Sequence, residues 1–276
     1  MDNHLKNWIS ENYNIVDPKN CSQVEISKVT EISCKEKYIE TIEDLERFEN
    51  IEKINLSDNK IIDLDLSVFP KLRELDCSYC PIQTLNILNN RSLEYIRYEG
   101  LRGNKLSNID FTGNPKLKKI IGGQDGLSQI DLSNNPDMEE IDIRLSQNLR
   151  HINVKNCSRL KKIRLWGVLV PYVDLTNNHE LEHVEINYLN TFKGKSDEYG
   201  DGYPRPFIFV DENFDRMKIN SQDLQYEYYT HVLIRVKRGS NEESVLKELN
   251  EMKQSILEVS NVASFHYQIM EKLKNE

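Results

Sequence analysis

Cys77 and Cys80 stand three positions apart and form the CxxC pair of this chain. That spacing is typical of half a zinc site or of a redox-active pair. No second CxxC and no nearby His-x-His is present to complete a zinc tetrad. The chain has five cysteines, an odd number that argues against a disulfide framework and indicates a reducing compartment. Because free cysteine packs like a small hydrophobe, we interpret both residues as structural.

Two other sets of residues have spacings that could hold a cation. His179 and His183 stand four apart, which brings two ligands together on a helix, but the surrounding pattern places them across a turn and a strand. A recurring aspartate could form a column of carboxylates, at Asp65, Asp110, Asp131 and Asp174. Such side chains are more often solvated or bonded to turn amides. We therefore predict no metal and no cofactor.

Motifs of the common enzyme classes are absent from the sequence. There is no GxSxG, no P-loop, no HExxH and no dinucleotide-binding glycine fingerprint. An aromatic and basic cluster near the carboxyl end has no recognised motif spacing; it comprises Tyr226, Tyr228, Tyr229, His231 and Arg235. We predict that the protein is not an enzyme.

The overall composition narrows the possible partners. The chain has 276 residues with a net charge of −9, and that charge works against broad binding to nucleic acid or anionic lipid. No apolar stretch approaches the roughly 20 residues that span a bilayer, and the first residues lack the pattern of a secretory signal. We therefore expect a cytoplasmic protein that binds neither nucleic acid nor membrane.

A repeated sequence pattern, which we call a phrase, runs along the chain and must position the residues of any site. Apolar residues open the phrase at spacings of 21, 21, 24, 21, 22 and 21, namely at Ile51, Leu72, Leu93, Leu117, Met138, Leu160 and Leu181. A first half such as Leu72-Arg-Glu-Leu-Asp-Cys77 is followed by a second half such as Ile130-Asp-Leu132. Alternation within each half predicts short strands, and recurring Asn and Pro predict the turns between them. Stacked units would share one continuous core.

These phrases resemble the leucine-rich repeat family in its short bacterial form, whose repeats have about 21 residues. The match covers residues 51–186. Asn59 and Asn104 fill the asparagine position of the first half, whereas Cys80 and Asp125 replace it. The second-half asparagine is present at Asn90, Asn114, Asn135 and Asn178. The resemblance implies a solenoid of short parallel strands in which these asparagines hydrogen-bond the backbone of neighbouring coils.

The segment before the repeats is similar to the amino-terminal cap of those bacterial proteins. Residues 5–13 have the apolar spacing of a short helix, and residues 25–32 are typical of a strand entering the first coil. Many family members carry an acidic calcium motif between these two elements. Residues 14–25 lack its alternating ligands and its glycine, so we predict no calcium site.

The predicted fold class is α/β, with four segments along the chain. They are an N-terminal cap at 1–50, a solenoid of six units plus a partial one at 51–190, a loop at 191–206, and a C-terminal cap or small α/β appendage at 207–276. In the last segment, residues 206–210 and 231–237 favour strands. A helix is predicted to begin at Ser240 or Asn241, with apolar residues from Val245 to Leu257 on one face. Residues 262–270 are apolar enough for another strand or a continued helix.

The family resemblance implies a rigid surface that binds another protein. On the outward face of the first-half strands we predict two columns of residues, with Trp166 just after a strand: Glu74, Tyr95, Lys119, Glu140, Lys162 and His183, then Asp76, Arg97, Ile121, Asp142, Arg164 and Glu185. We expect all of these except Ile121 to bind the partner. Tyr98 adds aromatic content nearby, and residues 101–104 would project as a loop. The alternatives are a solvated mixed-charge sheet, an effector-like protein whose repeats select a target for the C-terminal appendage, or an exported surface protein, which the cysteines disfavour.

Overall fold

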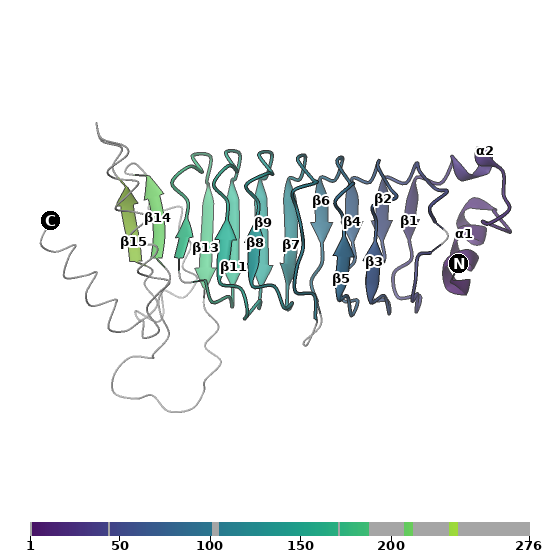
Figure 1. The fold of residues 1–276 in the computed structure, drawn as a ribbon, viewed down its shortest axis with the longest axis horizontal. Coiled ribbons are helices and arrows are strands. Elements are labelled where there is room, and N and C mark those ends of the chain that lie inside the picture. Colours follow the sequence, from purple (N-terminus) through teal and green to yellow (C-terminus); the bar gives the residue numbers. More distant parts are fainter. Residues whose placement is uncertain are drawn as a thin grey trace, which may run out of the picture.

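The protein is an elongated stack of parallel coils, shown by a computed structural model that describes residues 2–43, 45–100, 105–170, 172–187, 207–211 and 232–236. Helices α1 (Asn3–Tyr13) and α2 (Gln23–Ile26) lie at the amino-terminal end, and the coils follow one another along the long axis (Figure 1). The predicted leucine-rich repeat solenoid with short parallel strands is confirmed.

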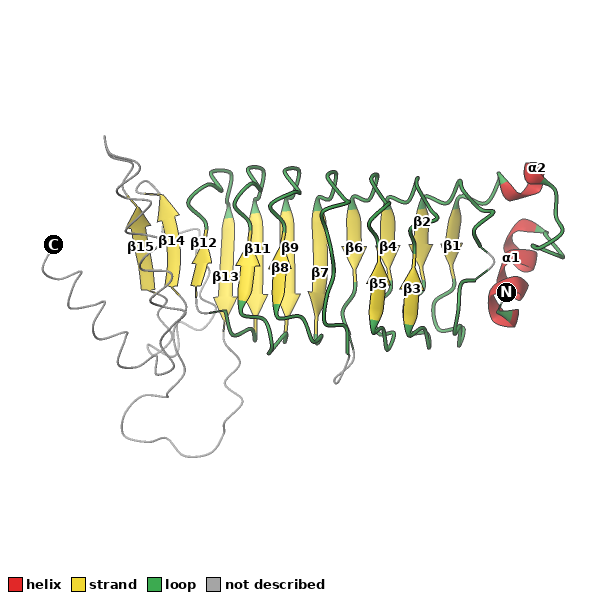
Figure 2. Ribbon diagram, viewed as in Figure 1, coloured by secondary structure: helices red, strands yellow, loops and turns green. Residues whose placement is uncertain are grey.

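One long parallel sheet contains a strand from each first-half phrase (Figure 2). Its eight strands follow in chain order: β1 (Glu31–Ser33), β2 (Lys53–Asn55), β4 (Glu74–Asp76), β6 (Tyr95–Arg97), β7 (Lys119–Gly123), β9 (Glu140–Arg144), β11 (Lys162–Trp166) and β13 (His183–Asn187). The strands lengthen from three residues in β1–β6 to five from β7 onward. We call the outward side of this sheet the sheet face.

Second-half phrases form three shorter parallel sheets on the other side of the coils. They pair β3 (Asp63–Asp65) with β5 (Thr84–Asn86), β8 (Gln129–Asp131) with β10 (His151–Asn153), and β12 (Tyr172–Asp174) with β14 (Phe207–Asp211) and β15 (Val232–Val236). The strands predicted at 206–210 and 231–237 are thereby confirmed. Because β14 pairs in parallel with β12, it continues the row of second-half strands.

The core lies between these two rows and runs the length of the stack. In each first-half strand the second residue points inward, and Leu75, Ile96, Ile120 and Ile141 are fully buried. Apolar side chains from Leu5 in the cap to Val210 in β14 form a single cluster. One coil alone would leave this apolar face exposed, so the coils stabilise one another.

Tyr98 and Gly122 are neighbours in one inward column of the core, and the Tyr98 ring occupies the space beside Gly122. The column contains Cys34, Leu56, Cys77, Tyr98, Gly122, Ile143, Leu165 and Ile186, all of them on or just after a first-half strand. A Cβ atom on Gly122 would lie 2.2 Å from the Tyr98 ring, so the ring fills the space that a side chain would take in the next coil. The large side chain of one coil and the absent side chain of the next therefore complement each other in volume.

Buried asparagines tie each coil to the preceding one, as the resemblance implied. The Nδ2 group of Asn114 donates to the carbonyl oxygens of Ile87 and Asn90, at 2.8 and 3.0 Å. Asn90, Asn135 and Asn178 donate in the same way. Where Cys157 replaces asparagine, its thiol donates to the Leu132 carbonyl at 3.3 Å. These bonds satisfy backbone carbonyls that the tight turns leave inside the protein.

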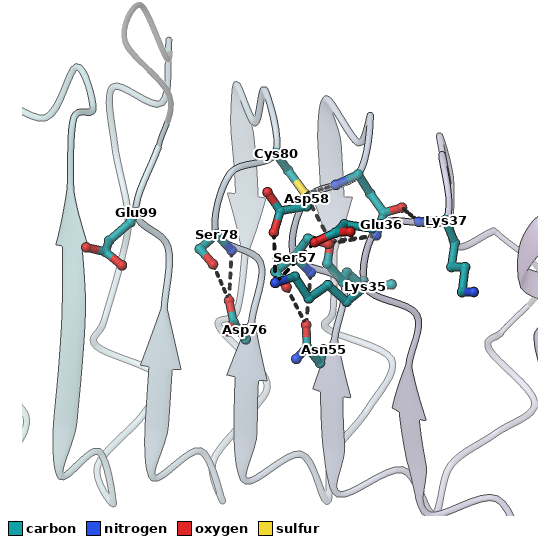
Figure 3. A network of polar contacts seen from close by, with 12 residues as sticks. Lys35, Glu36, Lys37, Asn55, Ser57, Asp58, Asp76, Ser78, Cys80 and Glu99 are labelled. Atoms are coloured by element: carbon teal, nitrogen blue, oxygen red, sulfur yellow. Dashed lines mark hydrogen bonds and ion pairs between the residues drawn. The ribbon is translucent and has the colours of Figure 1, made fainter.

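Short polar side chains close the turns at the strand ends (Figure 3). Asn55 Oδ1 accepts hydrogen bonds from the amide and hydroxyl of Ser57, and Asp76 Oδ1 accepts the same pair from Ser78. In the second-half turns, each of the four recurring aspartates accepts the amide two residues on: Asp65, Asp110, Asp131 and Asp174. Our interpretation of these aspartates as turn-bonded residues is confirmed.

The amino-terminal cap differs from the prediction in one place. The predicted helix at 5–13 is confirmed as α1, but the strand predicted over 25–32 is wrong in its first part. Ser22 caps α2 through a reciprocal capping box with Glu25, and only Glu31–Ser33 forms a strand. The Ser-x-x-Glu spacing favours a helix start over the weaker apolar pattern that follows it.

Several predictions lie outside the described residues. They include the loops at 101–104 and 191–206, the helix expected from residue 240, and the aromatic cluster at 226–231. The division of the chain at residues 50, 190 and 206 stays a prediction.

Candidate functional site

The sheet face brings the predicted site residues together in two straight columns. Parallel register places the first column as Glu74, Tyr95, Lys119, Glu140, Lys162 and His183 on neighbouring strands. The second column is Asp76, Arg97, Ile121, Asp142, Arg164 and Glu185. Each member stands one strand from the next because the repeat returns the same phrase position to the same edge of the coil. Their role in partner binding stays a prediction.

Asp142 departs from the expected exposure, since it is only 3% exposed. Arg144 donates to both of its carboxylate oxygens, at 2.8 and 2.7 Å, and Arg164 lies 3.4 Å away. Burial alone would raise the pKa of Asp142, but hydrogen bonds from Arg144 and the charges of both arginines hold that pKa below its usual range. Asp142 is therefore not a free contact residue; it fixes the positions of two arginines.

Trp166 and Tyr98 take different places from those predicted. Trp166 is the last residue of β11 rather than the residue after it, and it is 40% exposed beside Arg144 in the register. Tyr98 lies in the core at 2% exposure and does not reach the sheet face. Of the three aromatic residues considered, only Tyr95 and Trp166 face outward.

A third column of charged residues, missed in the sequence, lies directly before the strands. Its sign alternates from coil to coil through Glu52, Arg73, Glu94, Lys118, Glu139, Lys161 and Glu182. Glu94 joins Arg73 at 2.8 Å to Lys118 at 2.7 Å. Hydrogen bonds from Lys118 and then from Arg73 hold the pKa of Glu94 below its usual range. Alternating charge at the repeat spacing was the sequence signal that could have revealed this column.

A hollow of about 330 Å³ opens where the third column meets β4, β6 and β7. It is lined by Arg73, Glu74, Glu94, Tyr95, Lys118 and Lys119. Both lysines are already paired, Lys118 with Glu94 and Lys119 with Glu140 at 2.8 Å. The hollow therefore combines one aromatic wall with a compensated ring of charge.

Charge divides the sheet face into two halves. We count the outward residues of each strand together with the residue before it. Strands β1, β2, β4 and β6 carry five carboxylates against three cations: Glu31, Glu52, Glu74, Asp76 and Glu94 against Lys53, Arg73 and Arg97. Strands β7, β9 and β11 carry six cations against three carboxylates: Lys118, Lys119, Arg144, Lys161, Lys162 and Arg164 against Glu139, Glu140 and Asp142. We call the latter group the basic window.

A buried carboxyl group lies behind the basic window. Asp125 is 7% exposed and occupies the phrase position that Asn59 fills in an earlier coil. Its Oδ1 accepts a hydrogen bond from the Leu127 amide at 3.2 Å. Within the described residues its Oδ2 has no hydrogen-bond partner, and neither has the Tyr98 hydroxyl. Burial raises the pKa of Asp125 to about 6. The sequence flagged this position only as a substitution.

The cysteines and histidines that the sequence offered as possible redox or metal-binding residues are not arranged for that chemistry. Cys77 and Cys80 are buried, and burial raises the pKa of both thiols, that of Cys80 to about 11. His179 lies in a turn, while His183 begins β13 beside Glu185 at 3.6 Å. In the part of the chain that the structure describes, no group of three or more possible ligands is placed to hold a metal ion. Across the same ranges, every helix is too short or too polar to cross a membrane.

Comparison with known proteins identifies the repeats. Residues 49–95 match the family described as "Leucine Rich repeats (2 copies)". No curated protein matches the chain. Among solved structures, the functional domain of InlJ from Listeria monocytogenes aligns with a TM-score of 0.57 and 16% identity over 80% of this chain. Internalin C2 from the same organism aligns with a TM-score of 0.52 and 15% identity over 86% of this chain.

The aligned lengths differ between these two structures. This chain spans 56% of the InlJ structure and 93% of the internalin C2 structure. The InlJ domain is described as including a cysteine ladder. The inward column of the present protein instead alternates Cys34, Leu56 and Cys77 before it reaches Tyr98. The repeat spacing, the asparagine bonds and the structural alignments together show a leucine-rich repeat solenoid with short coils of about 21 residues, in which residues 49–95 match the repeat family.

Proposed function

We propose that this protein is a non-catalytic interaction module of the cytoplasm that holds a partner protein on its sheet face. The observation that carries the proposal is the placement of Tyr95 and Trp166 outward among arginines whose positions are fixed by carboxylates. Arg164 lies within 3.6 Å of Glu140, 3.4 Å of Asp142 and 3.5 Å of Glu185. Aromatic and arginine side chains that lose little freedom on binding are the residues that dominate protein interfaces.

The form of the solenoid also supports this role. The sheet face is continuous across eight strands and is fixed from behind by one core. An extended surface that does not rearrange avoids the ordering cost of flexible loops. The two Listeria structures support the solenoid fold on which this argument depends.

The test is affinity capture from a lysate of the source cell with two matched variants. Tyr95→Ala/Trp166→Ala removes both aromatic side chains from the sheet face. Gln129→Ala/His151→Ala truncates two exposed residues of β8 and β10 on the opposite side. Circular dichroism first establishes that both variants are folded.

We expect a partner that is retained by the wild type and by the β8/β10 variant but lost from the sheet-face variant. Equal retention by all three proteins would contradict the proposal, because binding would then not use the aromatic residues of the sheet face.

A further inference from the structure

We infer that the partner contributes a short, extended, acidic segment that crosses the basic window from the hollow beside Tyr95 to Trp166. This inference rests on the proposed function, since it names the chemistry of the partner on the same face. It is carried by the distribution of charge, the bounds of the basic window and the positions of the two aromatic side chains.

The positive charge of the basic window is not cancelled by its own carboxylates. Lys119 and Lys162 both approach Glu140, at 2.8 and 3.7 Å, and Arg144 and Arg164 share Asp142. Arg164 also lies 3.6 Å from Glu140, so Glu140 serves three cations and Asp142 serves two. Lys118 and Arg164 also contact Glu94 and Glu185, which lie outside the basic window. Within the basic window itself, six cations face three carboxylates, which leaves a net excess of positive charge. In a chain with a net charge of −9, this local excess marks the part of the sheet face that attracts carboxylates.

Acidic margins on both sides set the length of a suitable ligand. Carboxylates outnumber cations on β1–β6, and Glu182 and Glu185 lie at the β13 margin. A long polyanion such as a nucleic acid would continue over these margins and be repelled by them. A short acidic segment lies between them, so the charge pattern favours a peptide over a nucleic acid.

The spacing of the strands gives the approximate length of the bound segment. The residues from Tyr95 to Trp166 lie on four neighbouring strands, β6, β7, β9 and β11. Neighbouring strands are about 4.8 Å apart, so three intervals span about 14 Å across the sheet. Lys162 is level with Tyr95 in the register, and Trp166 stands four residues further along β11, which adds about 13 Å along the strand. The diagonal path is therefore about 20 Å long, and about six residues at about 3.3 Å each cross the basic window.

The two ends of this path offer different contacts. At one end, the hollow of about 330 Å³ sets the Tyr95 ring among three cations and two carboxylates, so it offers an aromatic wall with only a small excess of positive charge. At the other end, Trp166 at 40% exposure offers an apolar ring for an aliphatic or aromatic side chain. The expected segment is thus acidic over most of its length, with an apolar residue near one end.

The test is selection of random eight-residue peptides displayed on phage, with the whole protein as bait. Peptides that bind the wild type are then passed over a Lys119→Gln/Lys162→Gln variant, which lacks two cations of the basic window, and those that also bind the variant are discarded. We expect the surviving sequences to carry a net negative charge and an apolar residue. Neutral or basic survivors, or none that the depletion distinguishes, would overturn the inference.

One selected peptide is then synthesised and its affinity is measured by fluorescence polarisation. We expect about a tenfold loss of affinity in the Lys119→Gln/Lys162→Gln variant. The matched control is Lys53→Gln, which breaks an equivalent ion pair with Glu74 at 2.8 Å in the acidic half. That control should change the affinity less than about twofold. Equal affinity for all three proteins would overturn the inference.

Tryptophan fluorescence locates the peptide on the sheet face. The chain has two tryptophans, Trp8 in α1 and Trp166, so a Trp8→Phe protein reports on Trp166 alone. We expect the acidic peptide to change Trp166 emission in a saturable way; unchanged emission at saturation contradicts the path. If basic peptides instead change the Trp166 emission, the inference fails while the proposed function stands. If no ligand depends on the sheet face, both fail.

Discussion

The two halves of the sheet face share one scaffold and differ in what they present. Strands β1, β2, β4 and β6 have three residues each and an excess of carboxylates, whereas β7, β9 and β11 have five residues each and an excess of cations. Inward side chains are apolar and buried through both halves. The fold therefore depends on every second residue of a strand, which leaves the residues between free to change the surface from coil to coil.

The two halves meet between β6 and β7, where the repeat spacing and the inward column of the core are both irregular. The repeat has its longest spacing there, 24 residues from Leu93 to Leu117. Tyr98 fills the space beside Gly122 in the core, and Glu94 joins cations from both sides of the boundary. Substitutions at this boundary test whether the core or the surface holds the two halves together.

The largest effect is expected from Gly122→Leu. A leucine side chain would meet the Tyr98 ring at its first carbon atom, so the ring, which is only 2% exposed, would have to shift within the core. Overpacking of this kind costs up to about 3 kcal/mol of unfolding free energy. Chemical denaturation monitored by circular dichroism measures the loss.

The double variant Tyr98→Leu/Gly122→Leu is the control for this prediction. It replaces the large side chain of Tyr98 and the missing side chain of Gly122 with two leucines of intermediate size. We therefore expect it to recover more than half of the unfolding free energy that Gly122→Leu loses. Tyr98→Leu alone should also destabilise, because it leaves a cavity beside Gly122. If the two single losses simply add in the double variant, the pair does not act as a volume exchange and the prediction is wrong.

Asp125→Asn is expected to stabilise the protein at neutral pH. The substitution removes a buried carboxylate and restores the residue type that occupies the same phrase position at Asn59. Asn59 donates to the carbonyls of Cys34 and Leu56 at 2.7 and 2.8 Å, bonds that an ionised aspartate cannot make. We expect a gain of about 1–2 kcal/mol at about pH 7.5, measured by chemical denaturation.

The gain should depend on pH in a defined direction. The pKa of Asp125 is about 6 in the folded protein and 3.8 ordinarily, so the folded state holds its proton more tightly. The cost of the buried charge is present above pH 6 and disappears as pH falls from about 6 to about 4. The variant's advantage should shrink over that window. Asn59→Asp, the converse substitution, should destabilise, and an Asp125→Asn gain that is constant with pH would contradict the assignment.

The sequence predicted the features that repeat. Spacing of Leu72 and its equivalents predicted the strands and their register, and the second-half asparagines predicted the bonds between coils. Alternation within a strand likewise placed Tyr95, Lys119 and Glu140 on one face. Each of these follows from the local phrase and needs no information about neighbouring coils.

Features that depend on contacts between coils were not predictable in the same way. Asp142 is buried because arginines from two coils close over it, and Tyr98 is accommodated because the next coil has glycine. The raised pKa of Asp125 likewise comes from burial by its surroundings. The alternating column from Glu52 to Glu182 was readable from the sequence, but only after the repeats had been aligned.

The smallest effect is expected from Glu94→Gln, which removes the ion pairs that join the two halves on the surface. Glu94 is 25% exposed at its side chain and contacts Arg73 and Lys118. Partly exposed pairs of this kind contribute less than about 1 kcal/mol. The contribution should be present at neutral pH and be lost as pH falls through the lowered pKa of Glu94. Thermal unfolding at low and high salt measures it.

Salt distinguishes this surface link from the link through the core. Screening at about 0.3 M salt should remove most of the Glu94→Gln effect and leave the Gly122→Leu effect unchanged, because steric overlap does not depend on ionic strength. Glu52→Gln is the matched control, since Glu52 stands in the same column with Arg73 4.0 Å away, and it should matter less still. A Glu94→Gln loss that persists at high salt would mean that Glu94 acts through packing at the hollow. The two halves would then be joined by one continuous structure from core to surface, and the charge boundary would lose its independence from the fold.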